Sequence, residues 1–137
     1  MNELIQCQDL NDQAMKKQTM NTAKAHMEQA LTEILRQTGD GTGMRWTGTQ
    51  TDLVEMLYTV YLDGIFIDDK GCPETFASLV RRVCRTLHVN EPKNPRAVAY
   101  IARSRKGFHQ RPFLERYSAM LYRNHVVEPL HTLITKK

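Results

Sequence analysis

The sequence predicts an all-α protein: a small helical bundle with a helix-turn-helix-like core and a long N-terminal helix. Apolar residues recur at helical spacing in five separate stretches, and glycine or proline stands between the stretches. The apolar fraction of 41% and the charged fraction of 25% are ordinary for a chain that folds into a globular domain. We expect a helical arm over residues 1–43 and one domain over residues 44–137.

The first expected helix runs from Gln13 to Leu35, and its apolar residues fall on one helical face. They are Met20, Ala23, Met27, Ala30, Leu31, Ile34 and Leu35. The polar first dozen residues are expected to fray, and the three glycines within residues 38–43 end the helix. The apolar face either packs on the rest of the domain or forms a homodimer.

A second helix is expected after residues 49–52, where Thr and Asp side chains can accept hydrogen bonds from free backbone N–H groups. Trp46 precedes this cap and is expected to pack the start of the helix on the core. Asp63 and Gly64 end the helix, residues 65–67 suffice only for an edge strand, and residues 68–71 form a turn. The acids at 63, 68 and 69 lack the ligand pattern of a calcium loop, so a solvated turn is expected.

A third helix is expected from Pro73, which suits a first helical position. Its apolar stripe is the most regular in the chain and consists of Phe76, Leu79, Val80, Val83 and Leu87. Asn94 and Pro95 then cap and start a short fourth helix. The two helices resemble a helix-turn-helix unit, although their connection is longer than the about three to four residues of the standard motif.

The fourth helix is expected to have an apolar inner side and a cationic outer side. The inner side would contain Ala97, Val98, Ile101 and Ala102. The outer side would contain Arg96, Tyr100 (or Ala99), Arg103 and Lys106. Such a helix can sit close to its own core and still reach bases and phosphates. The alternative is that the cations in its last turn only offset the helix dipole.

The remainder of the chain is expected to be a loop, one helix and a tail. Gly107 would end the fourth helix, and residues 108–111 would form a basic loop along the phosphate backbone. Pro112 would start a final helix that is interrupted at Glu128 and Pro129, because proline has no N–H to donate. The Lys136–Lys137 tail is expected to be mobile.

Charge is distributed unevenly along the chain. Residues 81–123 contain eleven lysines and arginines and two acids, a net charge of +9, whereas the whole chain carries +4. This separation favours a cationic face that meets a polyanion, and double-stranded DNA is the expected partner. Arg96 and Arg103 are the candidates for base edges, and the other cations for phosphates. The expected DNA-binding residues are Arg81, Arg82, Arg85, Arg96, Tyr100, Arg103, Arg105, Lys106 and Arg111.

Other classes of protein lack their signatures. No apolar run approaches the roughly 20 residues that span a bilayer, and the first residues are unlike a signal peptide, so a cytoplasmic protein without membrane contact is expected. The separated Cys7, Cys72 and Cys84 suit free thiols rather than a disulfide framework or a zinc site. Scattered histidines and the lack of phosphate-loop or hydrolase motifs predict no enzyme, no cofactor and no metal.

Several of these motifs resemble a known family. Residues 46–49, residues 52–58, Gly64, the helix over 76–89, Arg103 to Lys106 and residues 113–115 are similar to the C-terminal part of RteC proteins, regulators of Bacteroides tetracycline-resistance conjugative transposons. The resemblance covers roughly residues 45–123. It implies a DNA-binding transcriptional regulator that switches on excision and transfer genes of a mobile element in response to tetracycline.

A helical protein-interaction module without DNA binding is the alternative. In that interpretation the positive face docks an acidic partner, and the N-terminal helix forms a dimer or binds a response partner. A gel shift separates the two hypotheses, because the interaction module predicts no binding to a duplex at low salt.

Overall fold

The computed structural model describes residues 2–37, 44–104 and 112–136, and these residues form six helices and one two-stranded sheet. The all-α prediction with a long N-terminal helix is confirmed. In chain order the elements are α1 (Asn2–Gln37), β1 (Met44–Trp46), α2 (Gln50–Leu62), α3 (Phe76–Thr86), α4 (Pro95–Ser104), α5 (Phe113–Tyr122), α6 (Pro129–Leu133) and β2 (Ile134–Lys136).

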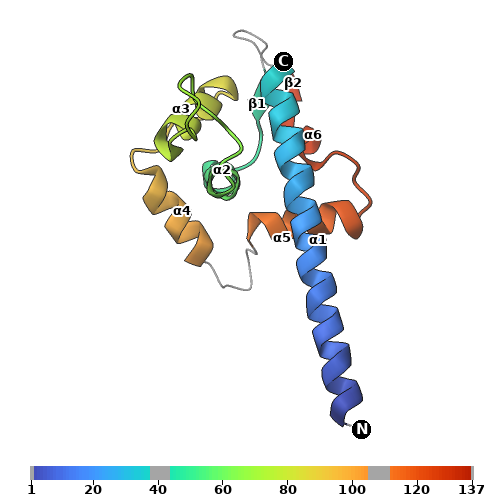
Figure 1. Cartoon of the computed structure of the whole chain (residues 1–137). Coiled ribbons are helices and arrows are strands. Elements are labelled where there is room, and N and C mark those ends of the chain that lie inside the picture. The colour runs from blue at the N-terminus through green and yellow to red at the C-terminus, as the bar shows by residue number, and fades with distance from the viewer. Residues whose placement is uncertain (1, 38–43, 105–111, 137) are drawn as a thin grey trace.

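Helix α2 is the centre of the bundle. Its run of buried residues, Leu53 to Leu57, covers more than one face, and Val60 extends the buried surface by a turn. A helix that is apolar on several sides needs neighbours on several sides. Helices α3 and α4 pack on one side of α2 and α5 packs on the other, and α1 lies across α5 and α6 (Figure 1).

Helix α1 begins earlier than predicted. The expected fraying before Gln13 is wrong, because the helix starts at Asn2. Its second half belongs to the core, where Ala23, Met27 and Leu31 are fully buried. The first half extends beyond the bundle (Figure 1). The part of the expected 1–43 arm between Ala23 and Ile34 therefore shares a core with the helices that follow, and the boundary at residue 43 stays a prediction.

The two short strands were not predicted. Strand β1 pairs antiparallel with β2, in the register Met44 with Lys136 and Trp46 with Ile134. Lys136 therefore belongs to a strand, and the expectation of a mobile tail is wrong for this residue. Strands of three residues are too short to show the alternation by which sequence patterns reveal a sheet.

The start of α2 follows the prediction. The Thr49 hydroxyl accepts from the Asp52 N–H at 3.1 Å and caps the helix. Trp46 is 5% exposed, and its Nε1 donates to the Thr49 carbonyl at 2.9 Å. Asp63 caps the other end, and Gly64 follows with a φ of 63°, a conformation that glycine adopts without steric cost.

The start of α3 differs from the prediction. Residues 65–67 form no strand, and Ile67 makes an isolated bridge with Pro73. Pro73 lies outside the helix, which begins at Phe76. Thr75 caps this start, since its hydroxyl accepts a hydrogen bond from the Ser78 N–H. The helix therefore starts three residues after Pro73. The threonine determines the start because its side chain accepts a hydrogen bond from a free N–H, which a proline side chain cannot do.

The end of α3 stores backbone strain at His88. The Val89 N–H donates to the Cys84 carbonyl at 2.8 Å, and this closing bond requires the left-handed conformation of His88, at φ 58°. That conformation costs an L-residue about 1–2 kcal/mol, but glycine almost nothing.

His88→Gly is therefore expected to raise the free energy of unfolding by about 0.5–1 kcal/mol after the flexibility of glycine in the unfolded chain is subtracted. Urea denaturation measures the change. His88→Ala keeps the strain and serves as the control, and a glycine variant no more stable than this control would contradict the assignment.

The last part of the chain is two helices rather than one interrupted helix. Helix α5 starts after Pro112 as predicted, but it ends at Tyr122 with Arg123 as its cap. His125, at φ 55°, turns the backbone. Pro129 then stands at the first position of α6, where a missing N–H costs nothing. The predicted interruption at Glu128 and Pro129 is in fact the start of a new helix.

Candidate nucleic-acid interface

Helices α3 and α4 are joined by residues 87–94 and both pack against α2. The Asn94 side chain accepts from the Ala97 N–H at 3.2 Å, and Pro95 is the first helical residue, so the predicted start of α4 is confirmed. The described part of α4 ends at Ser104. The predicted end at Gly107 and the basic loop over 108–111 lie outside the described residues. Two helices on a common support are typical of a helix-turn-helix unit, here with a long connection.

The inner side of α4 differs from the prediction. Ala99 and Ala102 are buried, at 0% and 1% exposure. Ala97 and Ile101, expected inside, are exposed, with Ile101 at 57%. The expected and the observed inner residues both have helical spacing. Close packing on α2 favours the side of α4 that carries the two small residues Ala99 and Ala102. Tyr100 lies outside as expected and is 73% exposed.

The cations of α4 are only partly described. Arg96 is exposed, and its guanidinium carbon lies 5.9 Å from the centre of the Tyr61 ring on α2. Such a contact orients the planar group and leaves the N–H groups at its edge available to an acceptor. Arg103 belongs to the last turn of α4, and its side chain is outside the described part. The predicted site residues Arg105, Lys106 and Arg111 also lie outside the described residues.

Two of the three predicted cations on α3 have acidic partners. Arg81 Nε lies 3.5 Å from Glu91. Arg82 forms a double contact with Glu74, at 2.8 and 3.3 Å, and its guanidinium lies 5.3 Å from the centre of the Phe66 ring. Arg82 therefore holds the 65–75 segment on α3, and its charge is partly offset. The sequence count for residues 81–123 missed this pair, because Glu74 stands before the counted segment.

Helices α3 and α4 themselves contain arginines and no acidic residue. Arg85 is exposed in the last turn of α3. Neither Phe76–Thr86 nor Pro95–Ser104 contains an Asp or Glu, so no carboxylate of these two helices would repel a phosphate. The exposed residues of α4 form one strip along the helix: Arg96, Ala97, Tyr100, Ile101 and Ser104.

Arg116 is in the cationic segment but has a structural role. It forms a two-point contact with Asp52, at 2.9 and 2.5 Å, and this hydrogen bonding raises the pKa of Arg116 further. The neighbouring Glu55 is buried and accepts from the Phe113 N–H at 3.0 Å. Together the two acids of α2 fix the first turn of α5 on the bundle.

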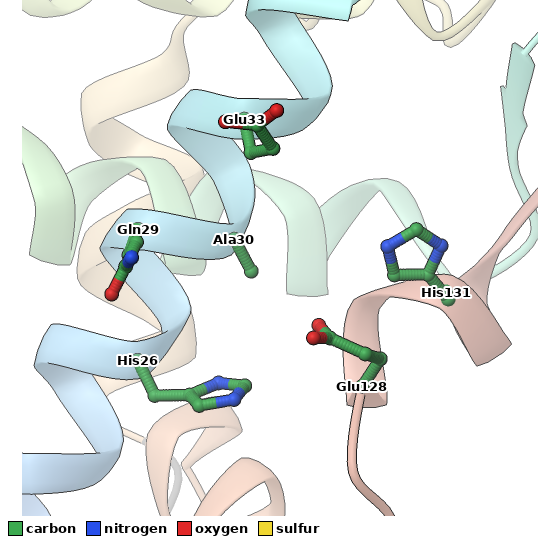
Figure 2. A pocket seen from close by; sticks show the side chains of 6 residues that line it. All are labelled: His26, Gln29, Ala30, Glu33, Glu128 and His131. Carbon is green, nitrogen blue, oxygen red and sulfur yellow. The ribbon is translucent and has the colours of Figure 1, made fainter.

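A polar pocket between α1 and α6 is the strongest competitor for the functional site (Figure 2). It has a volume of about 430 Å³ and is lined by His26, Gln29, Ala30, Glu33, Glu128 and His131. Its lining comes from two segments, residues 26–33 and residues 128–131, that are distant in the sequence, so no local motif indicated the pocket. Figure 2 shows the side chains of His26 and Glu128 directed toward each other across the pocket.

The pocket offers little reactive chemistry. His26 Nδ1 is hydrogen bonded to the Tyr117 hydroxyl at 2.7 Å, and burial raises the pKa of Tyr117 well above its usual range. Within residues 2–37, 44–104 and 112–136, no three His, Cys, Asp or Glu side chains gather as metal ligands. The His26–Tyr117 pair links α1 to α5, and we assign it to the stability of that packing.

The thiols that the structure describes are free, as predicted. Cys72 is exposed and Cys84 is buried in the core. Burial, with a smaller effect of Glu91, raises the pKa of Cys84 from 9.0 to about 11. A thiol with such a pKa is protonated at neutral pH and is a poor nucleophile. No helix in the described ranges is both long and apolar enough to cross a membrane.

Comparisons with known proteins add no family to this description. No protein-family model, no curated protein sequence and no solved structure matches the chain. The resemblance to RteC proteins therefore depends only on the motifs quoted from the sequence.

Proposed function

We propose that this chain is a transcriptional regulator that binds double-stranded DNA, with the exposed strip of α4 in the major groove and Arg85 of α3 near the phosphates. The observation that carries the proposal is the construction of α4, with alanines 99 and 102 buried against the bundle while Arg96 and Tyr100 project outward. The major groove is about 12 Å wide and admits one α-helix. Small inner residues and long outer residues suit that position.

Base reading is assigned to Arg96 and Arg103. Arginine can donate two parallel hydrogen bonds to the edge of a guanine, and Arg96 stands in the first turn of α4, where recognition helices contact bases. Arg103 follows seven residues later, about two helical turns along the same helix. We place Arg105, Lys106 and Arg111 on phosphates because of their position after α4 in the sequence, and give Arg81 and Arg82 a smaller share because acids accompany them.

The regulated genes are inferred from the motifs alone. The similarity of residues 45–123 to RteC proteins supports a role in the excision and transfer genes of a conjugative transposon. The cationic helices α3 and α4 are compatible with this role. The proposal places the protein in the cytoplasm with DNA.

A protein-interaction module is the second candidate. Two adjacent apolar side chains, Tyr100 and Ile101, are 73% and 57% exposed on α4. Protein interfaces are enriched in aromatic residues, and Arg81 and Arg82 already have acidic neighbours. An acidic protein partner could cover the same strip.

The test selects duplexes from a random pool and then measures their affinity at about 50 and 200 mM salt. Arg96→Ala is expected to cost about 1–3 kcal/mol on the selected duplex and to relax its sequence preference, because one base contact is lost. Arg103→Ala is expected to behave in the same way. Arg45→Ala, which removes an exposed cation from β1, is the matched control for charge.

The outcomes separate the candidates. Equal losses for Arg96→Ala and Arg45→Ala on selected and random duplexes would remove Arg96 from base reading and leave only general charge. No duplex binding by the wild type at about 50 mM salt would reject DNA binding in favour of the interaction module.

A further inference from the structure

The outer strip of α4 combines cations with an apolar patch. Ile101 is 57% exposed, and Ala97, one turn earlier on the same side of the helix, is also exposed. Exposed apolar residues are common singly, but these two lie one turn apart on the same side of a helix that contains no acid. A partner that covers this strip must offer acceptors for Arg96 and an apolar group beside them.

The DNA major groove offers such a combination. Phosphates and guanine edges accept hydrogen bonds, and among the bases only thymine presents a methyl group in that groove. Alanine and other small apolar side chains contact this methyl in known complexes, and a branched side chain can cover it from water. Tyr100, at 73% exposure, has a hydroxyl that can donate to a phosphate beside the methyl contact.

We propose that Ile101, together with Ala97, reads the 5-methyl groups of thymine, so that the preferred DNA site carries thymine opposite the centre of α4. This inference rests on the proposed function. It adds an apolar determinant of specificity to the cationic ones. The sequence did not indicate this determinant, because Ile101 was expected on the buried side of α4. The apolar pair selects A·T pairs at one position, and Arg96 selects its own base nearby.

The test replaces thymine by uracil, which removes the 5-methyl group and leaves the base pairing unchanged. Duplexes of about 20 base pairs with alternating A and T are compared with the same duplexes containing uracil for thymine, by fluorescence anisotropy at low salt. Wild-type protein is expected to bind the uracil duplex at least about fourfold more weakly, which corresponds to about 0.8 kcal/mol for one methyl removed from water. Alternating G and 5-methylcytosine should likewise be bound more tightly than unmethylated G and C.

Two variants locate the effect. Ile101→Ala should lose most of the difference between the thymine and uracil duplexes, because the branched side chain that covers the methyl is gone and only small alanine methyls remain near it. Val127→Ala removes an apolar residue with 77% exposure far from α4 in the sequence, and should keep the difference. Both residues are exposed, so circular dichroism is expected to show folded proteins with unchanged melting.

Each result has a distinct meaning. If the wild type binds both duplexes equally well, the methyl inference is wrong and DNA binding stands. If Ile101→Ala keeps the full preference for thymine, the preference comes from the deformability of the duplex and the inference is again wrong. If the wild type binds none of the duplexes at about 50 mM salt, the proposed function itself fails.

Discussion

Trp46→Ala is expected to lower the free energy of unfolding by about 3–5 kcal/mol, the largest effect of any single change considered. The indole is 5% exposed, its centre lies 6.2 Å from that of Phe113, and its Nε1 donates to the Thr49 carbonyl. It therefore joins β1, the cap of α2 and the start of α5. Truncation leaves a cavity where three elements meet and removes one of the two hydrogen bonds that the Thr49 carbonyl accepts, the other coming from the Leu53 N–H at 3.2 Å.

Urea denaturation of Trp46→Ala and Trp46→Phe separates these two contributions. The phenylalanine variant keeps most of the apolar volume and loses the N–H donor, so it should lie between the wild type and the alanine variant. Gly48 also packs on the indole, because a Cβ added to this glycine would lie only 2.9 Å from Nε1. A loss below about 1 kcal/mol for Trp46→Ala would contradict the central position of the indole.

The second large effect is a loss of stability as pH rises from 4.5 to 7. The Glu28 carboxyl on α1 is 9% exposed, and its Oε2 is a buried atom without a hydrogen-bond partner. Burial first, and then the nearby carboxyl of Asp63 at the end of α2, raise the pKa of Glu28 from 4.5 to about 7, whereas Lys24 acts in the opposite direction. Lys24 also pairs with Asp63 at 3.2 Å.

The sign follows from the two pKa values. Below pH 4.5 both the folded and the unfolded chain hold the Glu28 proton, and the full stability is present. Between 4.5 and about 7 the unfolded chain releases that proton and the folded chain retains it, so stability falls as pH rises. At about 1.4 kcal/mol for each pKa unit, the loss is at most about 3.5 kcal/mol.

Glu28→Gln removes the titrating group and keeps its shape. The difference in unfolding free energy between this variant and the wild type should grow in favour of glutamine from pH 4.5 to 7 and then stay constant. Glu33→Gln, at an exposed position on the same helix, is the matched control for the removal of one carboxyl from α1. A difference between Glu28→Gln and wild type that does not change with pH would contradict the raised pKa.

The sequence predicted the elements that carry strong local signals. Thr49, Asn94 and the stripe from Phe76 to Leu87 are where they were expected, because caps and apolar periodicity are properties of a few neighbouring residues. The helix start predicted at Pro73 was wrong, because a proline suits several positions near a helix start. The segment before α3 is held by the ion pair of Glu74 with Arg82, which the sequence does not reveal. The β1–β2 pair joins residues about ninety apart, which local patterns do not report.

The candidate site was predicted in composition and only partly in geometry. Arg96 and Tyr100 are exposed on α4 as expected. The sequence prediction placed Ile101 on the wrong side of α4. The expected inner stripe of Ala97, Val98, Ile101 and Ala102 is as regular as the α4 stripe that actually packs on α2. The pairing of Arg82 with Glu74 depends on the folded loop, so a charge count along the chain overstated the free positive charge.

The central claim is that the outer strip of α4 meets a DNA duplex. The most direct test is an NMR titration of ¹⁵N-labelled protein with a duplex of about 20 base pairs at about 50 mM salt. We predict that the largest shift changes fall on the amides of α4 and the end of α3, and that those of α6 and β2 stay in place. Changes centred on the pocket between α1 and α6, or no change at any residue, would contradict the account.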